Sequence, residues 1–151
     1  YNKAIKLDSL DAESFIDRGL TFSYKKDYDN ALEDFNHVKN LDSTGKHAQT
    51  AYFYIGKIKM LQYKNEEAIK QFDRLLTLEP TDAEVYFLRG TAKSNLVDID
   101  GSISDFDLAI KYRPDYMEAY ANRGVQKINK LPIEEKTAKR IKCIEDPCAD
   151  F

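Results

Sequence analysis

The sequence predicts an all-α protein built from repeated helix-turn-helix units. Three observations support this fold class. The 151-residue chain matches itself at a period of 34 to 37 residues, and its apolar and small residues recur with the spacing of a helix face. In addition, no run of β-branched residues alternates with polar ones, as a half-buried strand would require.

Four glycines mark the repeats, because each follows an aromatic residue by four positions. They are Gly19, Gly56, Gly90 and Gly124, separated by 37, 34 and 34 residues. An arginine precedes three of them, and a phenylalanine stands sixteen residues after each of the first three: Phe35, Phe72 and Phe106. The small residues Ala31, Ala68 and Ser102 also recur in phase. We expect each glycine to face the small residue of the partner helix, with the aromatic residues filling the space beside that contact.

Each unit contains two helix-forming segments. In the first unit, one segment spans residues 15–22 and the other spans 31–38, and each places three apolar or small residues on one face. The polar stretch 25–30 between them predicts a tight turn between antiparallel helices. The residues 40–43, 78–80 and 113–114 are typical of helix ends.

These recurring positions resemble the tetratricopeptide repeat, a 34-residue helix-turn-helix unit. The resemblance covers nearly the whole chain and implies a right-handed α-solenoid, a superhelix whose first helices line a concave groove. It gives a single domain over 1–151, with repeats at 12–45, 49–82, 83–116 and 117–151. The arginine-glycine pairs and the Ala-Asp-Phe at 149–151 resemble repeats that are common in bacterial proteins.

The sequence departs from the family pattern in two places. The family usually has a large aromatic residue at position 11 of the repeat. Here only the first unit has one, Phe22, and the next three units have Lys59, Lys93 and Lys127. We expect these lysines to lay their stems on apolar surface and keep their ammonium groups in water. The link around 43–47 is three residues longer than the others, so it should alter the local stacking angle or lengthen the helix that follows.

The two ends of the chain fall inside repeats. Residues 1–9 align with 35–43, and they are expected to end a preceding repeat of a longer solenoid. The last unit, 117–151, is expected to carry an insertion within 129–145, which would place Phe151 in the middle of a second helix. In the alternative alignment, residues 133–144 are themselves that second helix.

Composition excludes several classes of partner. The net charge is −3, which leaves no basic excess to neutralise the phosphates of a nucleic acid. No apolar run approaches the length of a membrane span, so we expect a soluble protein without membrane insertion. Cys143 and Cys148 are too few for a disulfide scaffold, and the compartment stays open.

No residue pattern indicates catalysis, a cofactor or a metal. His37 and His47 lack the spacing of a helical metal site, and both are expected to be solvated. The acidic pairs at 33–34 and 66–67 are interpreted as solvated helix faces. Asp98 or Asp100 should lie at the start of a helix. We therefore expect a protein that is not an enzyme.

Groove residues follow from the resemblance, which places particular repeat positions on the concave face. The candidates are Ile16, Leu20, Tyr24, Phe53, Tyr54, Lys57, Phe87, Leu88 and Asn122. The alternative is that some of them, particularly Tyr54 and Leu88, pack against the adjoining repeat. One subset of the family binds chaperone C-terminal carboxylates through a basic and amide clamp. The clamp positions here hold Ile16, Leu20, Tyr54, Glu84 and Leu88, so a chaperone-tail receptor is not expected.

The leading hypothesis is a non-catalytic scaffold that holds a protein or peptide in its groove. Two alternatives remain open. The chain could be a structural spacer that self-associates through open repeat ends, or the sensory or assembly part of a larger multidomain protein.

Overall fold

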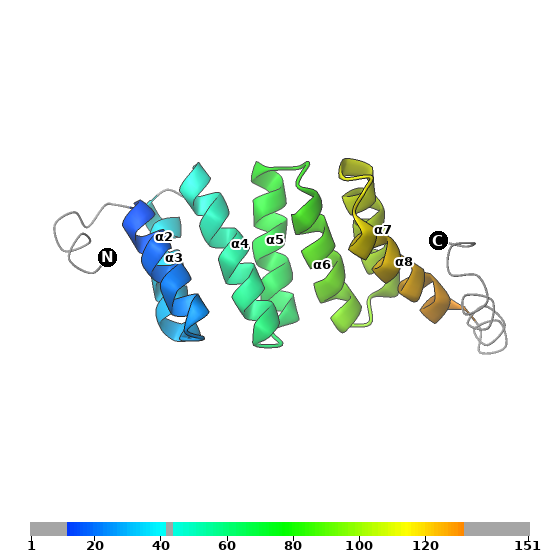
Figure 1. The fold of residues 1–151 in the computed structure, drawn as a ribbon, viewed down its shortest axis with the longest axis horizontal. Coiled ribbons are helices and arrows are strands. Elements are labelled where there is room, and N and C mark those ends of the chain that lie inside the picture. Colours follow the sequence, from blue (N-terminus) through cyan, green and yellow to red (C-terminus); the bar gives the residue numbers. More distant parts are fainter. Residues whose placement is uncertain (1–11, 42–43, 132–151) are drawn as a thin grey trace. The chain divides into compact units, whose positions relative to one another are not determined.

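The computed structural model describes residues 12–41 and 44–131 (Figure 1). These residues form seven α-helices, α2 to α8, and include no strand, so the all-α repeat fold is confirmed. The helices group into two compact units. The first unit holds α2 to α5 and the second holds α6 to α8, and each is described by itself.

The first unit contains two helix pairs. They are α2 (Ala12–Tyr24) with α3 (Tyr28–Leu41), and α4 (Lys46–Leu61) with α5 (Asn65–Leu78). Each helix packs against the next one in the chain, and α2 also contacts α4. The first helices of two successive repeats are therefore neighbours, as a helical repeat fold requires.

The second unit contains α6 (Ala83–Asn95), α7 (Ile99–Tyr112) and α8 (Met117–Lys130). Here α7 packs against both other helices, and α6 contacts α8. The Asp82 carboxylate accepts hydrogen bonds from the backbone N–H groups of Glu84 and Val85, which starts α6. Asp98 starts α7 by accepting from the N–H of Gly101, so the expected role of an acid at this helix start is confirmed for Asp98.

Each helix pair closes on a contact between a glycine and a phenylalanine. A Cβ atom added to Gly19 would lie 2.9 Å from the ring of Phe35, and one added to Gly90 would lie 2.9 Å from that of Phe106. Gly56 faces the ring of Phe72 still more closely. The prediction that each glycine faces the small residue is therefore wrong: the missing Cβ makes room for a ring.

The buried position of these rings explains why the contact is so close. Phe35 and Phe72 are fully buried, and Phe106 is nearly so. Each ring packs directly against the glycine of the first helix, so an added methyl group there would leave no room for the ring at normal packing density. The small residues Ala31, Ala68 and Ser102 are also fully buried.

The turn inside each pair uses a residue with left-handed backbone geometry. Lys26, Tyr63 and Val97 have φ values of 59°, 59° and 63°, and each lies seven residues after the repeat glycine. The next residue donates its backbone N–H to the carbonyl five residues earlier, at 2.9 to 3.0 Å. This pattern closes a helix C-terminus and is usually made with glycine.

The longer first link lengthens the helix that follows it. Helix α4 begins at Lys46, three residues before the predicted repeat start, and has 16 residues where α2 and α6 have 13. The expected helix ends are also confirmed, since α3, α5 and α7 stop at Leu41, Leu78 and Tyr112.

Ion pairs join the two helices of a repeat, which corrects two expectations. Asp34 was expected on a solvated face, but its side chain is 2% exposed and accepts two hydrogen bonds from Arg18. Lys59 and Lys93 do not hold their ammonium groups free in water. Lys59 Nζ lies 2.8 Å from a carboxylate oxygen of Glu67, and Lys93 Nζ lies 2.8 Å from one of Asp105. Both acids belong to the partner helix, within reach of a lysine stem.

Some predictions concern residues outside the described ranges. These are the end of a preceding repeat at 1–9, most of the insertion expected within 129–145, the alternative second helix at 133–144, and both cysteines. The single domain over 1–151 and its repeat boundaries stay predictions.

Candidate functional site

A pocket of about 300 Å³ opens in the first unit, between the first helices of its two repeats. It is lined mainly by apolar and aromatic side chains, which are Leu20, Ser23, Tyr24, Tyr28, Tyr54, Lys57, Ile58 and Leu61. Four of these residues, Leu20, Tyr24, Tyr54 and Lys57, were predicted as groove residues. The structure therefore brings together four of the nine candidates.

The helical register explains how these side chains converge. Leu20 and Tyr24 are one turn apart on α2, and residues 54, 57, 58 and 61 follow the spacing of one face of α4. Tyr28 reaches the pocket from the first residue of α3. The predicted positions all lie on first helices, which leaves out Tyr28 of α3. Ile58 was left out because its repeat position belongs to the core face.

The end of the pocket nearest the α2–α3 turn has an apolar rim that is open to solvent. Tyr24 is 89% exposed and Leu61 is 61% exposed. Tyr63, two residues after Leu61, is also highly exposed, but it does not line the pocket. Among the described residues of the first unit, these three are the large hydrophobic side chains that stand exposed. Apolar groups gathered at a pocket mouth in this way are typical of a binding surface.

Lys57 is the charged residue among those that line the pocket. Its Nζ lies 5.0 Å from the ring centre of Phe53 and 5.9 Å from that of Tyr54, so the two rings contribute cation–π attraction. The two rings meet edge to face at 5.3 Å. Lys57 forms no ion pair with any acid in the described ranges.

Two of the candidates take part in the core of the first unit. Ile16 is 8% exposed and belongs to the core cluster, together with Phe15 and Phe35, so it does not line the pocket. Tyr54 stacks one ring face on Phe35 at 5.5 Å, while it also lines the pocket. Tyr54 thus does both: it packs against the adjoining repeat and it lines the pocket.

The remaining candidates, Phe87, Leu88 and Asn122, belong to the second unit and are all half-buried. Phe87 contacts the ring of Phe106 at 5.8 Å and that of Tyr116 at 4.9 Å. Burial raises the pKa of the Tyr116 hydroxyl above its ordinary value. Phe87 therefore contributes to the packing of its own unit.

The described residues contain no group of three or more His, Cys, Asp or Glu side chains placed to hold a metal ion. His47 is exposed as expected, but His37 is half-buried. Its ring lies 4.1 Å from the ring of Phe15, because both occupy facing positions of α2 and α3. Within the same ranges, each helix is too short or too polar to cross a bilayer.

Comparison with known proteins identifies the class to which this chain belongs. The family model for the tetratricopeptide repeat matches residues 12–44 and 83–116. Together with the paired helices and the repeated glycine contact, this match defines an α-helical repeat protein. Residues 12–44 and 83–116 are thus tetratricopeptide repeats, and such repeats are in general a non-catalytic interaction fold.

Solved structures share this fold at low sequence identity. The crystal structure of MamA has a TM-score of 0.81 at 23% identity, covering 96% of this chain and 83% of that one. The second repeat domain of human RPAP3, in complex with an HSP70 peptide, has a TM-score of 0.71 at 22% identity and covers 77% and 94%. The first repeat domain of Spaghetti (RPAP3), bound to an HSP90 peptide, has 0.73 at 17% identity and covers 80% and 93%. No curated protein matches the sequence.

Proposed function

We propose that this protein is a non-catalytic interaction scaffold that binds a peptide or a partner helix at the pocket of the first unit. The observation that carries the proposal is the open apolar mouth formed by Tyr24 and Leu61 above a lined pocket. Two neighbours of the same fold, both RPAP3 domains, were solved with bound peptides, which supports a peptide as the class of ligand.

The ligand should not be held through a C-terminal carboxylate, as in the chaperone-binding subset of the family. The positions at which the family places its carboxylate clamp hold apolar or acidic residues here, among them Ile16, Leu20 and Glu84. Ile16 is buried in the core, so it offers nothing to a carboxylate. Burying one large apolar side chain of a ligand contributes about 1.5 to 3 kcal/mol, and this is the energy that the pocket supplies.

Selection from a random peptide library tests the proposal. The tightest peptide is synthesised and its dissociation constant is measured by fluorescence anisotropy with the wild-type protein, Tyr24→Ala and Leu61→Ala. We expect each substitution to weaken binding about tenfold, which corresponds to the loss of one anchoring side chain. Tyr63→Asn is the control, because it removes an equally exposed tyrosine of the same unit that does not line the pocket.

The result that contradicts the proposal is a selected peptide whose affinity is the same for the wild type and both pocket variants. Phe53→Ala adds a second check. It should weaken peptide binding through the loss of the ring beneath Lys57, while the helical circular dichroism signal stays unchanged.

Self-association is the second candidate function, and exposed apolar residues on α8 favour it. Met117 is 71% exposed and Val125 is 51% exposed, on the last helix of the described chain. Sedimentation velocity over a range of concentrations separates the two functions, since a peptide receptor remains monomeric. If the protein associates, Val125→Asp should return it to the monomer.

A further inference from the structure

The size of the pocket in the first unit limits what it can hold. Its volume of about 300 Å³ lies at the lower end of the range of ordinary ligand sites, which is about 300 to 1,000 Å³. Such a volume suits one large apolar side chain. Tyr24, Tyr28 and Tyr54 are among the residues that line it, so aromatic contacts with that side chain are available.

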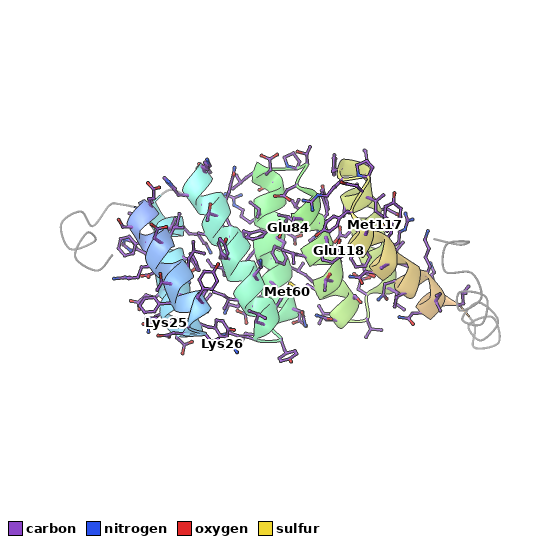
Figure 2. The ribbon with its side chains drawn as sticks, viewed as in Figure 1. Lys25, Lys26, Met60, Glu84, Met117 and Glu118 are labelled. Atoms are coloured by element: carbon purple, nitrogen blue, oxygen red, sulfur yellow. The ribbon has the colours of Figure 1, made fainter. Side chains whose placement is uncertain are left out.

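The charged side chain that lines the pocket is a lysine, Lys57. Lys25 and Lys26 directly follow Tyr24 at the end of α2, where both are exposed. Figure 2 shows Lys25 and Lys26 at the lower end of the first unit. The last turns of α4, which include Met60, run toward the same end. None of the eight residues that line the pocket is acidic.

Lys57 differs from three lysines that form an ion pair with an acid of a neighbouring helix. Lys59 pairs with Glu67, Lys93 pairs with Asp105, and Lys130 pairs with Asp100. Lys57 instead lies over the rings of Phe53 and Tyr54 without an acid among the described residues. An ammonium group held against rings beside an apolar pocket is available to a carboxylate that the ligand brings.

The acid in the α2–α3 turn, Asp27, is hydrogen-bonded to the start of α3. The Asp27 carboxylate accepts a hydrogen bond from the side-chain amide of Asn30 at 2.7 Å. It also accepts from the backbone N–H of Asn30, at 3.5 Å. Asp27 thus takes part in starting α3, and among the described residues it forms no ion pair with Lys25, Lys26 or Lys57.

From this combination we infer that the pocket selects an acidic peptide segment that carries one large apolar side chain. The side chain fills the pocket, and a carboxylate next to it in the peptide pairs with Lys57. The inference rests on the proposed function and specifies the chemistry of its ligand. A peptide with lysines around the same apolar residue would place like charges against Lys57 and would be rejected.

Four labelled nine-residue peptides with blocked ends test the inference by fluorescence anisotropy. Three carry a central phenylalanine flanked on each side by two glutamates, two glutamines or two lysines, and the fourth has alanine at the centre of the glutamate peptide. We expect the wild type to bind the glutamate–phenylalanine peptide about two- to fivefold more tightly than the glutamine peptide, as one partly exposed ion pair provides. Binding of the alanine peptide and of the lysine peptide should be lost.

Variants of Lys57 assign this preference to one residue. Lys57→Met keeps the length of the side chain and should bind the glutamate and glutamine peptides equally, whereas Lys57→Glu should prefer the lysine peptide. Lys46→Glu is the matched control, because it makes the same charge change eleven residues away at the exposed start of the same helix. The control should keep the preference of the wild type.

Four results would overturn the inference. If the glutamine peptide binds the wild type as tightly as the glutamate peptide, or if Lys57→Met keeps the preference, the pocket binds peptides without reading their charge. If none of the four peptides binds while a library-selected peptide does bind at Tyr24 and Leu61, the inference fails and the proposed function stands. If no peptide binds at all, both fail.

Discussion

Arg18 and Asp34 form a two-point ion pair that joins the two helices of the first repeat. Arg18 Nε donates to one carboxylate oxygen at 2.8 Å, and a terminal nitrogen donates to the other at 2.5 Å. These bonds raise the pKa of the Arg18 guanidinium above its ordinary value, because they favour its charged form. The pair therefore remains charged at any pH at which Asp34 is ionised.

The third repeat has the same pair, and the second repeat replaces both of its members. Arg89 binds Asp105 at 2.9 and 2.6 Å, with the same separation of sixteen residues along the chain. The equivalent residues of the second repeat are Ile55, which is buried, and Gln71. Replacing the arginine and aspartate of the first repeat by the isoleucine and glutamine of the second repeat therefore tests the role of the ion pair.

Arg18→Ile should destabilise the first unit by about 3 kcal/mol, because it leaves the carboxylate of Asp34 buried without its partner. Adding Asp34→Gln should recover much of this loss, since the second repeat uses isoleucine and glutamine at these positions. Urea denaturation followed by circular dichroism measures both free energies of unfolding. Strictly additive losses in the double variant would contradict the account.

Arg89→Ile provides an internal comparison for the same prediction. Lys93 Nζ lies 2.8 Å from the second carboxylate oxygen of Asp105, so this carboxylate keeps one cation after the substitution. We therefore expect a smaller loss than for Arg18→Ile. An equal or larger loss would show that Lys93 does not compensate.

The contact between glycine and phenylalanine predicts an unusual response to alanine. Alanine normally stabilises a helix relative to glycine by about 1 kcal/mol. Here Gly56→Ala should destabilise the protein by about 1 to 3 kcal/mol, because its Cβ would collide with the ring of Phe72. Thermal unfolding measures the change, and an unchanged or higher Tm would refute the close contact.

Two further substitutions test this contact: a larger side chain at a glycine position, and a smaller side chain at the phenylalanine position. Gly90→Leu should unfold its helix pair, since the ring of Phe106 cannot yield enough space. In the Gly56→Ala background, Phe72→Leu should cost less than it does in the wild type, because the shorter side chain relieves the overlap. Equal costs in the two backgrounds would mean that the two positions do not interact.

Much of the fold could be predicted because glycine and its aromatic companions recur in phase. The helix ends were also predictable, since Pro80 and Pro114 cannot continue a helix and follow two residues after the ends of α5 and α7. The ion pairs were missed although their signal is in the sequence: an arginine before the glycine and an aspartate before the phenylalanine. Spacing along one helix cannot show which of two adjacent acids, Glu33 or Asp34, faces another helix.

The candidate site was predictable only in part. Leu20, Tyr24, Tyr54 and Lys57 were found because first-helix positions repeat. Ile16 was assigned to the surface because its repeat position faces the groove in related proteins, whereas here the packing of α2 against α4 buries it. The left-handed turn residues could not be predicted, because Tyr63 and Val97 lack the glycine signature of that geometry.

Val97→Gly should stabilise the second unit. A β-branched residue with a φ of 63° is strained by about 1 to 2 kcal/mol, and Val97 is largely exposed, so little burial is lost. The gain is measured as a rise in Tm. The control is Leu96→Gly, because the neighbouring residue has a φ of −92° and gains nothing from glycine. A fall in Tm for Val97→Gly would contradict the strained turn.

Alkaline pH should destabilise the second unit through two tyrosines. Burial raises the pKa of Tyr86 and of Tyr116, so the folded state holds their protons more tightly than the unfolded chain does. Their contribution is fully present below the unfolded pKa of about 10 and is lost as the pH rises through the folded pKa. Stability above pH 10 should therefore fall less steeply in Tyr86→Phe and Tyr116→Phe than in the wild type.

Denaturation at a series of alkaline pH values measures these slopes. Tyr63→Phe is the control, because it removes a hydroxyl from an exposed side chain of the first unit. If both buried-site variants follow the wild-type slope, desolvation of these hydroxyls does not contribute to stability.

Mapping the contact surface by NMR tests the central claim most directly. The ¹⁵N-labelled protein is titrated with the glutamate-flanked phenylalanine peptide, and backbone amide shifts are followed. We predict that the largest shifts fall on residues 20–28 and 54–61, which surround the pocket. Shifts concentrated on α8, or spread evenly over all helices, would contradict the claim that the pocket of the first unit binds peptides.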